Sequence, residues 1–427
     1  MCVNDLGHIF VAWIDDRNGS DDLWMNRSTD RGDSWLVSDV QVDDGGDAQV
    51  SEPVLACEGA RVWLAWEDDR DGELDRRQIY LARSADFGQS FSAEIVVDGD
   101  YEGENMSLEP RIAVDGERVH VAWYDDRNGA YDIFVASSED AGATFGEPVR
   151  VDADGAGESY SAMPTIAAEN GQVFVAWEDS RHGSNDVVVA CSENGGRSFG
   201  KETRLDTADS PGLTHSFQPI VKADGGHAHV VWNDEVNGVG NDVFIASGSC
   251  NAWGPATRVD DSNAGFFESR LPTLEVSGAT AHVAWTDNRN GAYDVFYRRV
   301  EAGIPVGEEV RLDVGTDDGA SHSIEPALAF NPIGEQVVVA WNDGRADFED
   351  FGYDDIFYNH ASASGPFAAS DLRIDTVDAG VSFKTDLQIA ITGRVLFAAW
   401  SDGRNGTADV YFHRVEIGDG WVPPQWE

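Results

Sequence analysis

The stretch Val119-His-Val-Ala-Trp123-Tyr-Asp125-Asp-Arg127-Asn-Gly129-Ala-Tyr-Asp132 decides the fold, because variants of it return along the whole chain. Its Trp recurs at intervals of between 53 and 59 residues, and the eight copies are Trp13, Trp66, Trp123, Trp177, Trp232, Trp285, Trp341 and Trp400. A fixed period of this length is typical of arrays in which one supersecondary unit repeats. The chain of 427 residues therefore consists of eight repeats of about 54 residues.

The pattern inside each repeat predicts four short antiparallel strands. In the third repeat these strands are expected at 110–114, 119–123, 132–136 and 148–151, with Gly in turns between them. Apolar and polar residues alternate with a period of two, which is typical of strands, and Asn-Gly and Asp-Gly pairs favour hairpins. A Pro, which cannot donate to a ladder, stands at the expected head of the first strand as Pro53, Pro110, Pro164, Pro219, Pro272 and Pro326.

Four short strands cannot bury both faces of a sheet alone, but radial packing of eight such sheets does so. We therefore predict an all-β fold, a single eight-bladed β-propeller domain over residues 1–427 with four antiparallel strands per blade. Eight complete blades fit between Met1 and Glu427, so we expect the ring to close by packing of the first blade on the last. Because the eight Trp residues repeat in every blade, we assign them to the core between blades and not to a row of binding aromatics.

The charge balance is strongly acidic and restricts the classes of partner. The chain has 78 Asp and Glu against 29 Lys and Arg, which gives a net charge of −49. Such a charge repels nucleic acid and anionic membrane surfaces, and it favours multivalent cations, basic partners or a salty medium. No apolar run approaches the ~18 residues of a membrane span, so we expect no membrane insertion. We expect a monomer unless the chain is part of a larger assembly.

The four cysteines, Cys2, Cys57, Cys191 and Cys250, occupy non-equivalent places in the repeat. This spacing predicts neither a zinc site nor a disulfide framework, and we expect buried small apolar residues. Met1 is followed directly by strand-like sequence without a basic and apolar leader, so either a signal was removed or the protein is cytoplasmic. Of these two, we favour a location outside the cell or at its surface.

The expected turns between the third and fourth strands share one motif in the first four repeats. They read Ser28-Thr-Asp30-Arg-Gly32-Asp-Ser-Trp35, Ser84-Ala-Asp86-Phe-Gly88-Gln-Ser-Phe91, Ser138-Glu-Asp140-Ala-Gly142-Ala-Thr-Phe145 and Ser192-Glu-Asn194-Gly-Gly196-Arg-Ser-Phe199. This motif resembles the Asp box (BNR repeat), Ser-x-Asp-x-Gly-x-x-Trp/Phe, of sialidases and many other propellers. The resemblance implies a propeller in which Ser and Asp lock the hairpin on the face opposite the active site. Repeats five to eight lack the motif.

Sialidase chemistry does not follow from this resemblance. That family uses an Arg triad, a Tyr nucleophile paired with a Glu, and an Arg-Ile/Leu-Pro motif, typically on six blades. Arg270-Leu-Pro272 resembles the last of these, but Pro272 is an ordinary repeat proline and no unique Arg trio stands out.

A second signature, Trp-x-Asp-x-Arg-Asn-Gly-x-x-Asp, predicts an acidic turn between the second and third strands. Its first acid is Asp15, Asp68, Asp125, Asp179, Asp234, Asp287, Asp343 and Asp402 in successive repeats. Its second acid is Asp22, Asp132, Asp186, Asp242, Asp294, Asp355 and Asp409. A third acid ends the fourth strand as Asp43, Asp98, Asp152, Asp206, Asp260, Asp313 and Asp375. In a four-stranded meander all three acids lie on the same face of the disc, here called the acidic face.

Two interpretations of these acids stay open. Calcium takes six to eight oxygens from carboxylates and turn carbonyls. The first and second acids are therefore candidate ligands of a ring of calcium sites in the seven repeats that have both, all but the second repeat. Alternatively, each acid accepts hydrogen bonds from turn amides and pairs with the Arg inside the turn. We favour the structural interpretation, because that Arg would repel a cation and two carboxylates do not complete a coordination shell. Calcium is best sought at blade five, where Val236 replaces the Arg, and at the insertion 347–355 of blade seven.

Residues that break the repeat are the better candidates for ligand binding. They gather in the connections into each first strand, which we expect at the mouth of the central channel: Tyr160, His215, Glu268, Arg270, His322 and Lys384. Acids that point to the same region are Glu52, Glu109, Glu325 and Asp386. Hydrogen-bond donors, acceptors and an aromatic ring together suit a sugar or an acidic oligosaccharide.

The leading hypothesis is a non-catalytic recognition propeller, secreted or attached to a surface, which binds a glycan or protein ligand through the acidic face. Calcium is its candidate cofactor, and no organic cofactor is expected. The alternative is a carbohydrate-active enzyme at the channel mouth. A His or Tyr base with an Arg or Lys that neutralises a uronate would make a polysaccharide lyase, whereas paired carboxylates suit a glycoside hydrolase.

Overall fold

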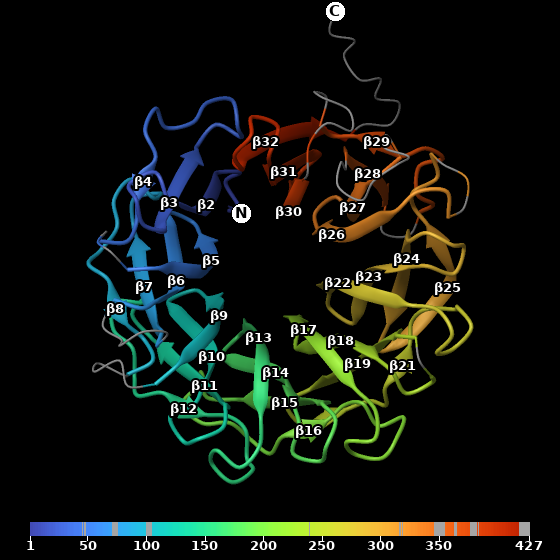
Figure 1. Ribbon diagram of the computed structural model, residues 1–427, viewed down its shortest axis with the longest axis horizontal. Coiled ribbons are helices and arrows are strands. Elements are labelled where there is room, and N and C mark those ends of the chain that lie inside the picture. Colours follow the sequence, from blue (N-terminus) through green and yellow to red (C-terminus); the bar gives the residue numbers. More distant parts are fainter. Residues whose placement is uncertain are drawn as a thin grey trace, which may run out of the picture.

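The computed structural model of the chain contains eight antiparallel sheets arranged as blades around a central opening (Figure 1). It describes residues 1–417 except 45, 47, 71–75, 100–104, 239, 316, 318, 346–354, 363–364, 376–381 and 383. The predicted eight-bladed β-propeller is confirmed. Every regular element in these ranges is a strand, and they contain no helix that could cross a membrane.

The blades follow one another along the chain. Blade 1 holds β1 (Cys2–Val3), β2 (Ile9–Asp15), β3 (Asp22–Ser28) and β4 (Val40–Gln41). Blade 2 holds β5 (Val50–Glu58), β6 (Arg61–Asp68), β7 (Gln78–Ser84) and β8 (Ile95–Val96). Blade 3 holds β9 (Ser107–Asp115), β10 (Arg118–Asp125), β11 (Asp132–Ser138) and β12 (Val149–Arg150). Blade 4 holds β13 (Ser161–Glu169), β14 (Gln172–Asp179), β15 (Asp186–Ser192) and β16 (Thr203–Arg204).

The second half of the ring repeats this order with small changes. Blade 5 holds β17 (Ser216–Asp224), β18 (His227–Asp234), β19 (Asp242–Ser249), β20 (Ala252–Trp253) and β21 (Thr257–Arg258). Blade 6 holds β22 (Ser269–Ser277), β23 (Thr280–Asp287), β24 (Asp294–Glu301) and β25 (Ile304–Arg311). Blade 7 holds β26 (Ser323–Asn331), β27 (Gln336–Asp343), β28 (Asp355–Ser362) and β29 (Leu372–Arg373). Blade 8 holds β30 (Lys384–Thr392), β31 (Val395–Asp402) and β32 (Asp409–Glu416).

Each blade is an antiparallel meander whose first strand borders the central opening and whose last strand is outermost (Figure 1). The two acids of the acidic turn face each other where the second and third strands pair, as Asp125 faces Asp132. The fourth strand expected in blade 8 falls on residues 418–427, which lie outside the described residues. The meander therefore places all acidic turns on one face of the disc.

The hydrophobic core lies between neighbouring blades. Seven of the eight repeated Trp side chains are buried, and only Trp13 is half-buried. Trp177 of blade 4, for example, packs with Ala122, Ile133 and Val135 of blade 3. Burial of large aromatic rings is the main favourable term for such short sheets, which cannot cover their own faces. The assignment of these Trp residues to the core is confirmed.

The ring closes by packing of blade 1 on blade 8. Ile9 and Val11 of β2 form one buried cluster with Phe397 and Ala399 of β31. At the rim of this cluster Trp35 meets the ring of Phe412 edge to face, with 4.8 Å between centroids. The expected closure by packing is confirmed.

The first strands differ from the prediction at their prolines. We expected Pro at the head of each strand, but β9 begins at Ser107, three residues before Pro110, and its register on β10 shifts between Leu108 and Arg111. In seven blades the residue at this bulge adopts φ between 47° and 57°, and these residues are Glu52, Glu109, Met163, Gln218, Leu271, Glu325 and Asp386. A bulge leaves one residue unpaired, which lets a strand accept a residue without an N–H at its centre.

Two disulfides join neighbouring blades and correct the prediction for the cysteines. Cys2 of β1 bonds Cys57 of β5, and Cys191 of β15 bonds Cys250, which follows β19. Within each pair the two cysteines are 55 or 59 residues apart, close to one repeat. Two cysteines at different positions of adjacent repeats can still face each other across the interface between blades. The prediction was wrong because it expected paired cysteines only at the same position of the repeat.

We predict that reduction of these disulfides lowers the melting temperature. A crosslink that closes a loop of 55 residues stabilises by about 4 kcal/mol through the entropy of the unfolded chain. Thermal denaturation followed by circular dichroism, with and without a phosphine reductant, measures the effect. A variant with all four cysteines replaced by serine should melt at the temperature of the reduced protein and ignore the reductant. Equal melting temperatures for the oxidised and reduced protein would contradict the prediction.

Candidate functional site

The first acid of each acidic turn is saturated by hydrogen bonds from the protein. In blade 3, Asp125 accepts Trp123 Nε1 at 3.4 Å, the Arg127 N–H at 2.7 Å and Ser107 Oγ at 2.7 Å. Arg127 Nη2 adds an ion pair at 2.6 Å. In all eight blades the residue two positions on donates its N–H to this acid, at 2.7–3.0 Å. In seven blades that residue is an Arg that also pairs through its guanidinium.

The charge state of these acids follows from the same contacts. In blade 1 the hydrogen bond from Arg17 lowers the pKa of Asp15 to about 2. In blade 5, where Val236 replaces the Arg, burial raises the pKa of Asp234. These contacts support the structural interpretation of the acidic turn. The calcium hypothesis for the first and second acids stays a prediction, and most of the insertion 347–355 lies outside the described residues.

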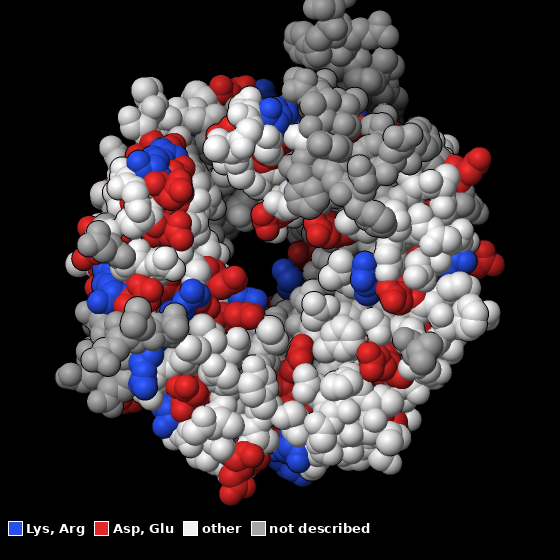
Figure 2. All heavy atoms as spheres, in the orientation of Figure 1, with Lys and Arg blue, Asp and Glu red and all other residues white. Residues whose placement is uncertain are grey.

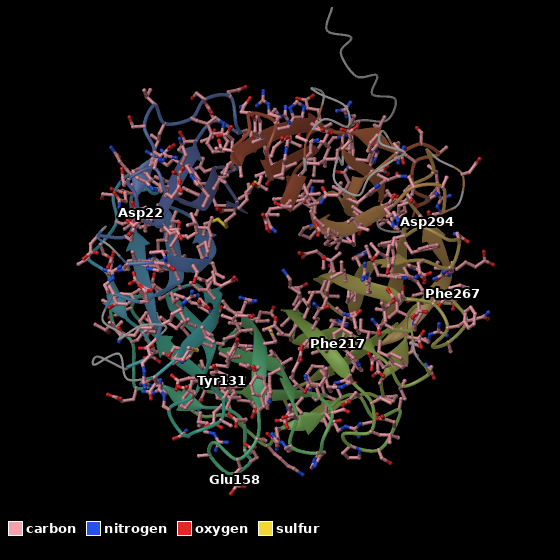
Figure 3. The ribbon with its side chains drawn as sticks, in the orientation of Figure 1. Asp22, Tyr131, Glu158, Phe217, Phe267 and Asp294 are labelled. Carbon is pink, nitrogen blue, oxygen red and sulfur yellow. A yellow bond between two sulfur atoms is a disulfide. The ribbon has the colours of Figure 1, made fainter. Side chains whose placement is uncertain are left out.

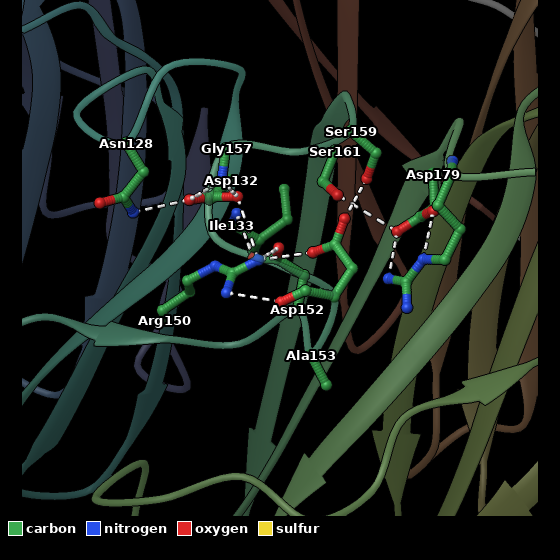
Figure 4. A network of polar contacts seen from close by, with 12 residues as sticks. Asn128, Asp132, Ile133, Arg150, Asp152, Ala153, Gly157, Ser159, Ser161 and Asp179 are labelled. Atoms are coloured by element: carbon green, nitrogen blue, oxygen red, sulfur yellow. Dashed lines mark hydrogen bonds and ion pairs between the residues drawn. The ribbon is translucent and has the colours of Figure 1, made fainter.

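A second repeated arginine, which we did not single out from the sequence, joins the second and third acids. Arg150 Nη2 lies 3.1 Å from Asp132, 2.5 Å from Asp152 and 2.5 Å from Asp154 (Figure 4). The carboxylate oxygens of this triad lie within 4.8 Å of one another, a spacing that could hold a metal ion. Here the guanidinium occupies the position between them. Burial raises the pKa of Asp152 above its usual range.

We call this arrangement the arginine clamp: a fourth-strand Arg bonded to the second and third acids of its blade. Four further clamps are Arg204 with Asp186 and Asp206, Arg258 with Asp242 and Asp260, Arg311 with Asp294 and Asp313, and Arg373 with Asp355 and Asp375. Blades 1 and 2 carry Gln41 and Val96 in place of this Arg.

The clamps also hold the connections that carry the ligand-binding candidates. The second acid of a clamp accepts the N–H of a Gly in the connection to the next blade. The pairs are Gly157 to Asp132 at 3.1 Å, Gly212 to Asp186 at 2.8 Å, Gly265 to Asp242 at 3.2 Å and Gly319 to Asp294 at 3.1 Å. Three residues after each Gly stand Tyr160, His215, Glu268 and His322. The acids of the clamps therefore position four of the six candidates.

The structure divides the six candidates into separate groups. Tyr160, 45% exposed, packs edge to face on Tyr131 with 5.1 Å between centroids. His215 is exposed, and its Nδ1 accepts the Asn185 N–H at 3.5 Å. Lys384 is not brought to the rim: it is buried, with Nζ 3.1 Å from Asp375 and a second ion pair to Asp355.

Glu268, Arg270 and His322 come together with Tyr293, and we call these four residues the rim cluster. The Tyr293 hydroxyl donates to Glu268, and the Arg270 guanidinium lies over the Tyr293 ring, 4.2 Å from its centroid. The rings of Tyr293 and His322 are 5.5 Å apart, and the Tyr293 N–H donates to His322 Nδ1 at 3.3 Å.

Sequence reasoning missed Tyr293, which stands directly before the second acid Asp294, in the place of Tyr131 in blade 3. In other blades the residue at this place is polar, as at Asn185 and Asn241. An aromatic residue directly before the second acid was therefore the available signal in the sequence. Tyr131 and Asp294 lie on different sides of the central opening (Figure 3). The six candidates therefore do not meet at one place, as we expected, but form separate groups around the propeller.

Arg270 differs from the repeated arginines in its lack of hydrogen bonds. Its Nε is buried without a hydrogen-bond partner, but such an Nε also occurs at Arg70, Arg150, Arg204 and Arg289. The Arg270 guanidinium, however, donates no hydrogen bond within the described residues, and its ion pair to Glu268 is 3.7 Å long. Its side chain is 40% exposed. No other described blade has Arg at this place, where Leu108, Ala162 and Phe217 stand instead.

The bulges beside the central opening divide the channel wall into two halves. Acids occupy the bulges of blades 2, 3, 7 and 8 as Glu52, Glu109, Glu325 and Asp386, whereas blades 4, 5 and 6 have Met163, Gln218 and Leu271. Acidic and basic side chains border the opening in the space-filling view (Figure 2). Burial raises the pKa of Glu109, and the carboxylates of Glu52, Glu67 and Glu178 add to this shift.

The face opposite the acidic turns carries the four motifs that resemble Asp boxes. In the first, Ser28 Oγ accepts the Gly32 N–H at 2.7 Å and Asp30 accepts the Ser34 N–H at 2.8 Å. Equivalent bonds lock the other three turns. A hollow of about 440 Å³ between blades 7 and 8, lined by Ile333, His360 and Arg394, also lies at this end of the strands, away from the rim cluster.

Comparisons with known proteins show likeness of fold. No protein-family model and no curated protein matches the sequence. An ulvan lyase from a new family of polysaccharide lyases has a TM-score of 0.53 and 10% identity, over 86% of this chain and 94% of its own. The polysaccharide lyase Uly1 has a TM-score of 0.52 and 12% identity, over 91% of this chain and 95% of its own. A leech intramolecular trans-sialidase has a TM-score of 0.43 and 11% identity, over 86% and 68%. The chain thus shares the propeller fold of proteins that act on carbohydrates.

We predict that the Arg150 guanidinium, and not a metal ion, neutralises the triad of Asp132, Asp152 and Asp154. Replacement Arg150→Met leaves buried carboxylates without a cation, which costs about 3 kcal/mol. The variant should melt at a lower temperature than the wild type, and millimolar CaCl₂ should restore part of the loss.

The control is Arg197→Met, which removes an exposed ion pair to Glu139 and should leave the melting temperature unchanged. For the wild type, neither CaCl₂ nor EDTA should move the melting temperature. A wild-type protein that melts earlier in EDTA would refute this assignment and favour calcium in the acidic turns.

Proposed function

We propose that the protein recognises a glycan through its acidic face, and that the rim cluster contacts an acidic sugar of that glycan. The observation that carries this proposal is the half-exposed guanidinium of Arg270 in blade 6, which donates no hydrogen bond within the described residues. A planar guanidinium binds a carboxylate through two parallel hydrogen bonds. The 3.7 Å contact with Glu268 leaves this capacity unused.

The protonation states of the rim cluster make it a set of hydrogen-bond donors. Burial and the hydrogen bond to Glu268 raise the pKa of Tyr293 to about 12, so its hydroxyl keeps its proton at neutral pH. Burial and the charge of Arg270 lower the pKa of His322, so its ring is neutral there. Because Nδ1 accepts the Tyr293 N–H, the proton of the neutral ring sits on Nε2. The Tyr293 hydroxyl donates its single proton to Glu268, so the donors that suit the oxygens of a uronate are the Arg270 guanidinium and the imidazole N–H.

The charges around the channel favour a glycan with isolated acidic sugars over a dense polyanion. Four bulges carry acids, and Glu268 already balances the charge of Arg270. A polymer with a carboxylate on every sugar would be repelled by the acids of blades 7, 8, 2 and 3. A largely neutral chain with single uronates meets the guanidinium without that repulsion.

The two disulfides support a location outside the cell, because such bonds persist in oxidising compartments. The four turns that resemble Asp boxes support a relation to Asp-box propellers. Both statements extend the proposal of a secreted or surface-attached recognition protein.

A second candidate function is polysaccharide elimination, which the nearness of Tyr293 and His322 to Arg270 favours. Elimination needs a base that removes the proton beside the uronate carboxyl group, and an acid for the leaving oxygen. Tyr293, with its raised pKa, is suited to the second role and not to the first. Incubation with ulvan and glucuronoxylan, followed at the ultraviolet absorbance of unsaturated products, tests this function. Product formation that Tyr293→Phe abolishes would establish a lyase.

We predict that Arg270→Gln weakens binding of glucuronoxylan at least tenfold, because it removes the charge that faces the carboxylate. This corresponds to the roughly 1.5–3 kcal/mol of a charge-assisted hydrogen bond. His322→Gln keeps a donor and should lose less. Calorimetry with a panel of glucuronoxylan, ulvan, polygalacturonate and neutral arabinan measures both the effect and the preferred charge density.

The matched control is Arg197→Gln, which changes the net charge equally at the opposite face. It should bind as the wild type does. If Arg270→Gln and the wild type bind every member of the panel alike, the rim cluster is not the site.

A further inference from the structure

We propose that Phe266 forms a second sugar-binding subsite beside the rim cluster, on which the apolar face of a neutral pyranose stacks. This inference rests on the proposed function and extends it from one acidic sugar to an oligosaccharide. It assigns a role to an exposed aromatic ring that neither the repeat nor the core requires.

Phe266 is exposed although it belongs to the residue types that are normally buried. Its side chain is 71% exposed, in the connection between β21 and β22. The adjacent Phe267 meets it edge to face, with 4.8 Å between centroids and an interplanar angle of 81°. This packing supports one edge of the Phe266 ring and leaves much of its surface in water.

The connection that carries Phe266 is held by hydrogen bonds of its backbone at Gly265 and Phe266. The Phe266 N–H donates to the Asn263 carbonyl at 3.0 Å, and the Gly265 N–H donates to Asp242 of the arginine clamp at 3.2 Å. The Gly240 N–H donates to the Gly265 carbonyl at 3.0 Å. A ring on such a fixed segment loses little conformational entropy when a ligand stacks on it.

The acidic turn of blade 5 lies directly against this connection. A Cβ atom at Gly240 would lie 2.2 Å from the Phe267 carbonyl oxygen, and one at Gly238 would lie 2.5 Å from the Gly265 oxygen. Only Gly at both places lets the two backbones approach so closely. The close packing of this turn therefore fixes the position of the connection that carries the Phe266 side chain.

The ring and the rim cluster share one segment of chain. Phe266 stands two residues before Glu268, whose own N–H is held by Asn288 Oδ1 at 2.9 Å. Figure 3 shows Phe267, next to Phe266, and Asp294, next to Tyr293 of the rim cluster, on the same side of the propeller. An apolar plane next to a set of polar donors matches a sugar chain, whose C–H faces stack while its oxygens accept hydrogen bonds.

Charge also suits a neutral sugar at this place. The bulges of blades 5 and 6, on either side of the connection, carry Gln218 and Leu271, whereas acids stand at the bulges of blades 7 and 8. A neutral pyranose at Phe266 and a single uronate at Arg270 thus fit the local charges.

The test compares two probes, free glucuronate and a xylotriose that carries one glucuronate. Phe266→Ala should weaken binding of the tetrasaccharide about tenfold, or about 1.4 kcal/mol, and leave binding of glucuronate unchanged, because it removes the stacking surface alone. Arg270→Gln should weaken binding of both probes. Phe266→Trp keeps an aromatic face and should bind the tetrasaccharide as the wild type does.

The control variant is Ile333→Ala, which removes another exposed apolar side chain, 96% exposed, from the opposite face. It should bind both probes normally. If Phe266→Ala binds the tetrasaccharide as the wild type does while Arg270→Gln does not, the subsite is refuted and the proposed function stands. If Arg270→Gln leaves the binding of both probes unchanged, the proposed function fails and the subsite with it.

Discussion

A buried carboxylate in every acidic turn is the constraint on which the rest of the molecule depends. The Asp after each core Trp has to be neutralised where it is buried, because an unpaired charge in such a place costs several kcal/mol. The fold meets this need with the turn N–H, the indole N–H and the guanidinium two residues on, as at Asp125 with Trp123 and Arg127. Because the indole N–H and the turn N–H donate to the same carboxylate, these bonds fix the Trp side chain and the turn relative to each other. Much of the acidity of the chain is therefore part of its scaffold.

The second layer of this charge pairing connects the scaffold to the rim. In the arginine clamps, a fourth-strand Arg neutralises two acids, and one of those acids holds a Gly in the connection to the next blade. His322 follows Gly319 by three residues, and Glu268 follows Gly265 by the same interval. The clamps repeat from blade to blade, whereas the residues after each Gly vary. The connections are therefore held in the same way in several blades but carry different side chains. Variation at such places changes the side chains that the rim presents without a change in the fold.

The sequence allowed the ring to be predicted, because the period of the Trp residues and the alternation of the strands are local signals. The bulges were not foreseen, since a Pro is compatible both with the head of a strand and with a bulge, and only the position of Ser107 separates the two. The disulfides escaped because Cys191 and Cys250 look unrelated until adjacent blades place them side by side. For the site, the residues that break the repeat were found, but their grouping was not. The Arg270 guanidinium lies over the Tyr293 ring within blade 6, and Lys384 turns inward to Asp375, and neither contact can be read from the sequence.

The contrast between Arg127 and Arg270 is the physical reason why we propose recognition by the rim cluster. Arg127 makes short charge-assisted bonds to Asp125 within its own turn, so a ligand would have to break them before it could bind. Arg270 lies over an aromatic ring and has an orphaned Nε, and its nearest carboxylate is too distant for a hydrogen bond. A ligand carboxylate at this guanidinium therefore gains bonds without the loss of any. The neighbouring Tyr293 hydroxyl stays protonated, and so the group binds an anion in its ground state more readily than it abstracts a proton. That balance of charge and protonation is what a recognition site requires.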